Sequence, residues 1–188
     1  MTRNARVLVP ALCALLLGLA SVLAQVVSFD FMPRGGKTFL LRLLGDSPDV
    51  GELRKITETQ RDAEEWAKAL APKKGAMSDR ELRTLANYLA VNMPLAEGAL
   101  LEAEKKGDVS AALPQDGQQL AVDQCQFCHA LFSGYLAHDR EVNGWLATFV
   151  TPAHRGIELT EKEKETFARY SAINMPMKIE DVPEELRF

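Results

Sequence analysis

Apolar residues recur every three or four positions along most of the chain beyond residue 51, which is the spacing of amphipathic helices. Charged and polar residues occupy the positions between them, and no segment alternates apolar and polar residues as a half-buried strand would. The pattern therefore predicts an all-α protein. Helices are expected at about 52–71, 78–92, 96–106, 115–129, 140–150 and 160–173.

Two of these helices have clear start signals. Ser78 with Glu81, and Thr160 with Glu163, form the capping box in which each side chain pairs with a free backbone N–H group. We therefore expect helices to begin directly after Ser78 and Thr160.

Residues 30–51 lack such a pattern, because glycines and prolines interrupt any long periodicity. We expect a mixed segment there. Its Gly-Gly-Lys-Thr, at 35–38, resembles the end of a phosphate-binding loop, but Phe31 stands where that loop requires glycine. No phosphate cradle is expected.

The chain contains an internal repeat. Residues 77–95 (MSDRELRTLANYLAVNMPL) and 159–177 (LTEKEKETFARYSAINMPM) align without gaps at an offset of 82, with eight of 19 positions identical. Upstream, Trp66, Pro72 and Gly75 match Trp145, Pro152 and Gly156 with small shifts. The polar segment 105–117 contains Gly and Pro and marks a boundary. We predict two related helical units, 30–108 and 109–188.

The first residues predict export. Arg3 and Arg6 precede the apolar run Val7–Leu23, and Val22 and Ala24 are the small residues before a cleavage point, so residues 1–24 read as a signal peptide. The uncharged run extends to residue 29 and is also long enough for a retained membrane anchor. In both cases the remaining chain is expected in the periplasm, either soluble or anchored to the cytoplasmic membrane.

Composition narrows the classes of function. The chain has 188 residues, of which 47% are hydrophobic and 26% charged, with a formal net charge of −4. This mild acidity, without a Lys/Arg cluster interleaved with aromatic residues, argues against a nucleic-acid partner.

The most specific motif is Cys125-x-x-Cys128-His129. Two thiols at this spacing can add to the two vinyl groups of a haem, and the adjacent histidine then binds the iron as the proximal ligand. Covalent attachment takes place outside the cytoplasm, which agrees with the expected export. At the offset of the repeat the motif aligns with residues 43–47, LLGDS, so only the second unit carries it.

Three other uses of these residues are less consistent with the sequence. A structural zinc site needs four ligands, and His138 and His154 do not form the usual H-x3–5-H pair. A thioredoxin-type C-x-x-C expects a strand before its helix. A disulfide in so short a loop would leave His129 unexplained.

Residues 115–177 resemble a class I cytochrome c domain. The resemblance lies in a Gly-bearing helix that leads into the C-x-x-C-H motif, a mid-domain tryptophan (Trp145), and a capped last helix with an aromatic residue (Tyr170). It implies a small helical fold around one covalent haem c, with the first and last helices crossing. It extends weakly to 52–95, as in two-domain cytochromes of which one domain has lost its haem.

The resemblance also implies a second iron ligand, usually a methionine before the last helix. The corresponding loop, 150–160, has no methionine but contains His154. Met175 and Met177 after the last helix are the alternatives. Met175 recurs as Met93 in the unit without cysteines, which favours a packing role, so His154 is the preferred ligand.

These observations predict an exported monohaem cytochrome c that transfers single electrons and is not itself an enzyme. Its expected partners are redox proteins or the other subunits of a membrane-associated oxidoreductase. If the second axial position were open, the alternative would be a haem protein that binds small ligands or a peroxidase-type protein.

Overall fold

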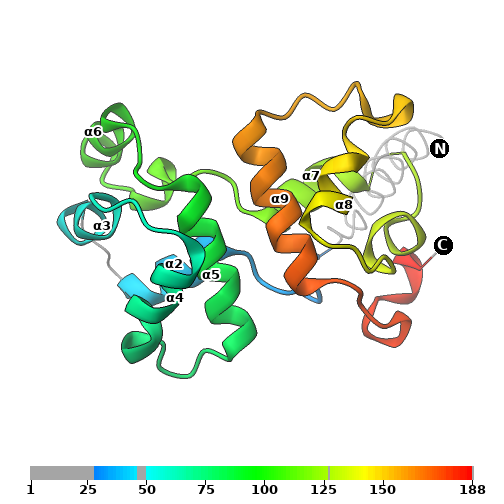
Figure 1. Cartoon of the computed structure of the whole chain (residues 1–188), viewed down its shortest axis with the longest axis horizontal. Helices are drawn as coiled ribbons and strands as arrows, with labels where there is room; N and C mark the ends of the chain where they lie inside the picture. Colours follow the sequence, from blue (N-terminus) through cyan, green and yellow to red (C-terminus); the bar gives the residue numbers. More distant parts are fainter. Residues whose placement is uncertain (1–27, 46–49, 127, 188) are drawn as a thin grey trace, which may run out of the picture.

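The computed structural model describes residues 28–45, 50–126 and 128–187. The predicted signal or anchor segment lies outside these residues. Every regular element in the described ranges is helical, with no strand, so the all-α prediction is confirmed (Figure 1). None of the described helices has the length and apolarity needed to cross a bilayer.

The helices follow one another along the chain with short connections. They are α2 (Gly36–Leu44), α3 (Val50–Thr57), α4 (Ala63–Leu70), α5 (Asp79–Asn92), α6 (Glu97–Lys106), α7 (Gly117–Cys125), α8 (Val142–Thr148) and α9 (Glu161–Asn174). Short 3-10 turns include η3 (Val109–Ala112) and η5 (Pro152–His154), and η4 (Phe132–Leu136) is a π-helical turn.

Both predicted capping boxes are present. The Ser78 and Thr160 side chains each accept the N–H of the glutamate three residues later, and that glutamate accepts the N–H of the cap residue. Helices α5 and α9 therefore begin where the sequence predicts.

Three predictions about the helices were wrong. The helix expected at 52–71 is two helices, because Asp62 and Glu65 form a further capping box that starts α4. The helix expected at 115–129 ends at Cys125. The segment expected to be mixed contains α2, which ends where Gly45 adopts a positive φ of 91°.

The described helices pack around two hydrophobic cores (Figure 1). Helices α2 to α6 surround the first core, and α7 to α9 surround the second. The first core also takes in Val109, Ala112 and Leu113, and the second takes in Met32. The division at residue 108 stays a prediction, since the packing exchanges short segments on both sides of it.

The repeat has a three-dimensional counterpart. Gly36 at the start of α2 touches Tyr88 of α5, and Gly117 at the start of α7 touches Tyr170 of α9; a Cβ on either glycine would lie 2.1 Å from the tyrosine Cβ. Helices α5 and α9 both end at a buried methionine, and each is followed by a cis Met–Pro bond. Helix α2 thus corresponds to α7, and α5 to α9.

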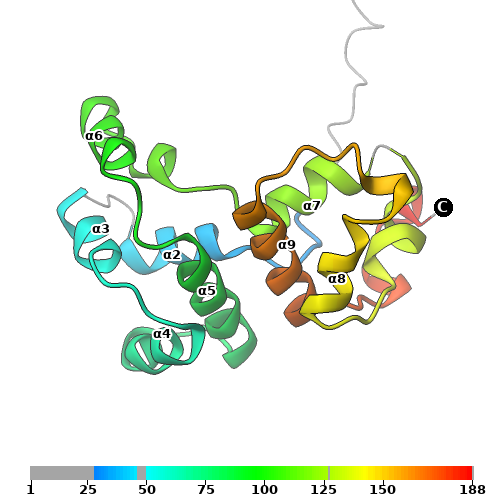
Figure 2. The same ribbon diagram turned by 45° about the horizontal axis from the view of Figure 1, so that its top comes forward.

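Helices α5 and α9 lie side by side at the centre of the molecule (Figures 1 and 2). Their contacts are reciprocal: the Asn92 amide donates to Thr166 Oγ1 at 3.0 Å, and the Asn174 amide donates to Thr84 Oγ1 at 3.1 Å. Because each unit presents the same residues to the other, the contact has the form of the interface in a symmetric dimer.

Candidate haem-binding site

Helix α7 carries the first cysteine of the motif on its last turn. Asp116 caps the start of α7, because its carboxylate accepts the N–H groups of Gln118 and Gln119 at 3.1 Å each. Leu120 is fully buried in the second core and fixes which side of the helix faces inward. Cys125 is half-buried at the helix end, and burial raises the pKa of its thiol to about 12.

Cys128 and His129 follow in the turn beyond α7, and both are exposed. The His129 ring lies close against Gly134, where a Cβ would be only 1.8 Å from Nδ1, so this approach requires glycine. His129 Nδ1 is 3.4 Å from the carbonyl oxygen of Ala130. A carbonyl only accepts, so the hydrogen belongs on Nδ1 and Nε2 keeps a free lone pair.

The Nδ1 atom of His154 also has a hydrogen-bond partner, which is a side-chain hydroxyl instead of a backbone carbonyl. His154 ends the 3-10 turn η5, and its Nδ1 is 2.9 Å from Thr151 Oγ1. The Thr151 hydroxyl donates its own hydrogen to the Thr148 carbonyl at 2.8 Å, so it accepts from His154. His154 therefore also carries its hydrogen on Nδ1 and leaves Nε2 free. Metal-binding histidines are usually oriented by such a hydrogen bond on the second ring nitrogen.

The two histidine rings are close together. Their centroids are 6.4 Å apart, and the ring planes are inclined by 75°. An iron bonded to both rings at about 2 Å per bond would separate the two nitrogens by about 4 Å and the centroids by roughly 6 to 6.5 Å. The spacing fits two axial imidazoles on one iron. With the thiols of Cys125 and Cys128 beside His129 in the chain, these residues would hold a covalent haem.

The methionine alternatives, Met175 and Met177, belong to the second core, against which Cys125 also packs. Met175 is buried in the core at the end of α9, as Met93 is at the end of α5. Met177 donates its backbone N–H to Leu136 and lines a cavity of about 720 Å³ together with Pro33, Arg80 and other residues, none of them from the C-x-x-C-H motif.

Sequence reasoning missed a buried polar pair in the second core. The Tyr135 hydroxyl is 2.8 Å from Ser171 Oγ, which itself donates to the Phe167 carbonyl, so Tyr135 donates to Ser171. Burial raises the pKa of Tyr135 well above its ordinary value and keeps it a neutral donor. In the repeat, Ser171 aligns with Leu89 of the first unit, and that difference was the available signal.

Aromatic rings surround this pair. Trp145 and Phe167 lie 5.3 and 5.4 Å from the Tyr135 ring, and Phe149 lies 5.4 Å from Phe167. Phe167 aligns with Leu85 in the first unit. The second core is therefore richer in rings than the first at matched positions. Both units have a buried tryptophan, Trp66 and Trp145, and neither indole N–H has a hydrogen-bond partner among the described residues.

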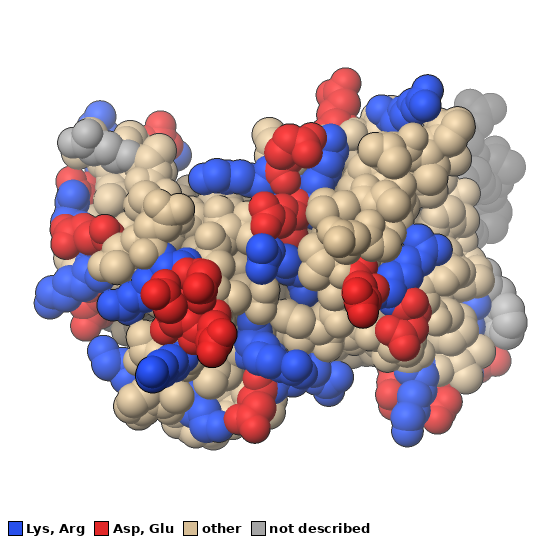
Figure 3. Space-filling model, viewed as in Figure 1, with Lys and Arg blue, Asp and Glu red and all other residues tan. Residues whose placement is uncertain are grey.

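The number of candidate ligands around His129 would be enough for a haem iron but not for a bare metal ion. In the part of the chain that the structure describes, no three His, Cys, Asp or Glu side chains converge as a metal-ion site. A haem iron takes four ligands from the porphyrin and needs only one or two from the protein. Basic and acidic side chains alternate over the face seen in Figure 3.

No protein-family model matches this chain, and comparisons with curated proteins and with solved structures give no match either.

Proposed function

We propose that this chain is an exported c-type cytochrome that transfers single electrons. One haem c would be attached through Cys125 and Cys128, with His129 and His154 as the two iron ligands. The observation that carries the proposal is the 6.4 Å spacing of the two imidazole rings, each of which has a hydrogen-bond partner at Nδ1. Met175 and Met177 remain the alternatives to His154.

When bound, the haem supplies a reversible one-electron couple. The residues of the chain orient and protect it. Thr151 and the Ala130 carbonyl hold the two imidazoles by their Nδ1–H groups, and the aromatic core around Tyr135 excludes water from the inner side. The exposed Cys128 and His129 lie at the surface, where a haem edge would be accessible to a redox partner.

The presence of a helical unit without cysteines favours a subunit of an oxidoreductase over a simple electron carrier. Electron transfer alone does not require it, whereas a membrane-associated oxidoreductase needs surface for docking its subunits. We therefore propose redox proteins or oxidoreductase subunits as partners, with the protein in the periplasm, either soluble or anchored by its first residues.

The test is covalent haem in the full chain, expressed for export together with a c-type haem attachment system. The wild type should stain for haem on a denaturing gel, and the Cys125→Ala/Cys128→Ala double variant should not. Cys13→Ala is the matched control and should stain like the wild type. An unstained wild type, or a stained double variant, would refute the proposal.

Carbon monoxide separates electron transfer from the alternative with an open axial site. With His154 on the iron, the reduced protein should bind carbon monoxide slowly and weakly. Rapid, complete binding would instead support a protein for small ligands or peroxide.

A further inference from the structure

The side chain of Asp116 lies between the starts of two helices that belong to different units. Its Oδ1 accepts the N–H groups of Gln118 and Gln119 at the start of α7, and its Oδ2 accepts the N–H of Lys37 at the start of α2, at 3.1 Å. The N–H of Thr38 also lowers the pKa of this carboxyl group, as the N–H groups of Lys37, Gln118 and Gln119 do. First-turn N–H groups have no acceptor within their own helix, so one side chain serves both helix ends.

The approach of the two segments is close enough to demand glycine. A Cβ at Gly35 would lie 2.0 Å from the Asp116 carboxyl carbon. Gly35 begins the Gly-Gly-Lys-Thr stretch that resembles a phosphate-binding loop. The start of α2 does face a carboxyl group, but that group comes from the other unit of the same chain.

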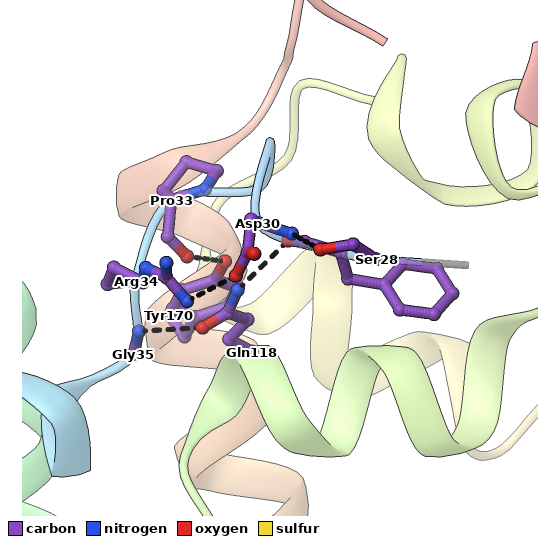
Figure 4. Close-up of polar contacts among 8 residues, drawn as sticks. Ser28, Asp30, Pro33, Arg34, Gly35, Gln118 and Tyr170 are labelled. Atoms are coloured by element: carbon purple, nitrogen blue, oxygen red, sulfur yellow. Dashed lines mark hydrogen bonds and ion pairs between the residues drawn. The ribbon is translucent and has the colours of Figure 1, made fainter. Parts of the chain in front are cut away.

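The segment before α2 is also hydrogen-bonded to the second unit. The N–H of Gly35 donates to Gln118 Oε1 at 3.3 Å, and the Gln118 amide donates to the Phe29 carbonyl at 3.3 Å (Figure 4). The Tyr170 hydroxyl donates to the Pro33 carbonyl at 2.6 Å. Together with the Asp116 carboxyl group, these contacts tie the start of the first unit to α7 and α9.

The Asp116 carboxyl group lies in a buried environment. Asp116 is 1% exposed, and Gly35, which occupies the same cap position before α2, has no side chain that could replace it. Burial raises the pKa of Asp116, while the four N–H groups act in the opposite direction. Removing the carboxyl group would leave buried donors of both helices unpaired.

We infer that Asp116 is a positioning residue that clamps the two units together and thereby fixes α7, the helix that ends at Cys125. The unit without cysteines then acts as the scaffold that holds the attachment helix. The clamp itself is independent of haem, whereas its consequence for the attachment site rests on the proposed function.

Hydrogen exchange of the full chain, read by peptide mass spectrometry, tests the clamp. Asp116→Ala should accelerate exchange at the start of α2, in the other unit, by at least about fivefold, as much as at the start of α7. Gly35→Ala should accelerate exchange at both helix starts, because the added Cβ would collide with the Asp116 carboxyl group. Asp62→Ala removes an exposed cap that serves only α4, and should affect α4 alone.

If Asp116→Ala changes α7 but leaves α2 unchanged, Asp116 is an ordinary cap and the inference fails. Should Asp116→Ala not fold, Asp116→Asn and Gly35→Ala provide the same comparison. Asn keeps one carbonyl acceptor, so Asp116→Asn should retain the protection of one helix start and lose that of the other. Wild-type protection of both helix starts in Asp116→Asn and in Gly35→Ala would also overturn the clamp.

Unfolding in urea tests the consequence for the haem unit. Haem absorbance and far-ultraviolet circular dichroism should give coincident curves in the wild type and in Asp62→Ala, and separate curves in Asp116→Ala. Coincident curves in Asp116→Ala would refute the scaffold role. A wild type without haem would refute the proposed function and leave the exchange test standing.

Discussion

At the scale of single residues, Thr151 determines which ring nitrogen of His154 is available to bind a metal. Its hydroxyl hydrogen is committed to the Thr148 carbonyl, so its oxygen accepts the Nδ1–H of His154. This fixes the tautomer with a free Nε2, and a hydrogen bond on Nδ1 makes an imidazole a stronger donor to a metal.

Thr151→Val keeps the shape of the side chain and removes this acceptor. Strong imidazole donation stabilises ferric iron more than ferrous iron, so the reduction potential should rise in the variant. The expected shift is some tens of millivolts, since a tenfold change in relative affinity is about 59 mV for a one-electron couple. Potentiometric titration measures it. Thr148→Val is the control, because Thr148 binds Thr151 through its backbone carbonyl, and an equal shift in both variants would contradict this role of Thr151.

The sequence predicts His154 as an iron ligand but does not predict the hydrogen bond between Tyr135 and Ser171. His154 is visible because the repeat provides a comparison and the loop has one residue able to bind iron. For Ser171 the repeat offers only the difference from the aligned Leu89, which does not indicate a hydrogen-bond partner for the hydroxyl. Only packing shows that it is fully buried against Tyr135.

At the scale of the elements, α5 and α9 were predictable and α2 was not. Both ends of the capping boxes of α5 and α9 lie within four consecutive residues, so the signal is local. Helix α2 has Gly35 at its cap position, and the acceptor for its first turn is Asp116, far along the chain. A local pattern cannot contain a cap that the other unit supplies.

The capping box of Ser78 and Glu81 at the start of α5 should make the free energy of unfolding depend on pH. The Ser78 N–H, first, and the Arg42 guanidinium, to a smaller extent, hold the pKa of Glu81 below its ordinary value of 4.5. Ionised Glu81 therefore stabilises the fold above that value, and the stabilisation is lost as the pH falls through the lower, folded-state pKa. Glu81→Gln should cost about 0.5–1 kcal/mol near neutral pH and almost nothing at strongly acidic pH.

Urea unfolding across the acidic range checks this expectation. The difference in midpoint between the wild type and Glu81→Gln should shrink as the pH falls. Glu58→Gln, at an exposed position after α3, is the matched control. A difference that stays constant with pH would show that the charge of Glu81 does not contribute.

At the scale of the whole molecule, two related helical units pack against each other. Both have the same crossing of a glycine-bearing helix with a tyrosine-bearing helix, and they meet through reciprocal Asn–Thr hydrogen bonds between α5 and α9. The sequence repeat predicts the relation of the units. Their docking depends on side chains such as Asn92 and Asn174, whose partners lie in the other copy, so it could not be read from either copy alone.

The central claim is that one haem is held by two histidines, and the near-infrared magnetic circular dichroism spectrum of the oxidised full-length protein tests it most directly. The expected spectrum is that of a low-spin ferric haem with two nitrogen ligands, unchanged in Met175→Ala and lost in His154→Ala. A band characteristic of methionine sulfur on iron, present in the wild type and absent in Met175→Ala, would contradict it, and Met93 would then be the remnant of a lost ligand.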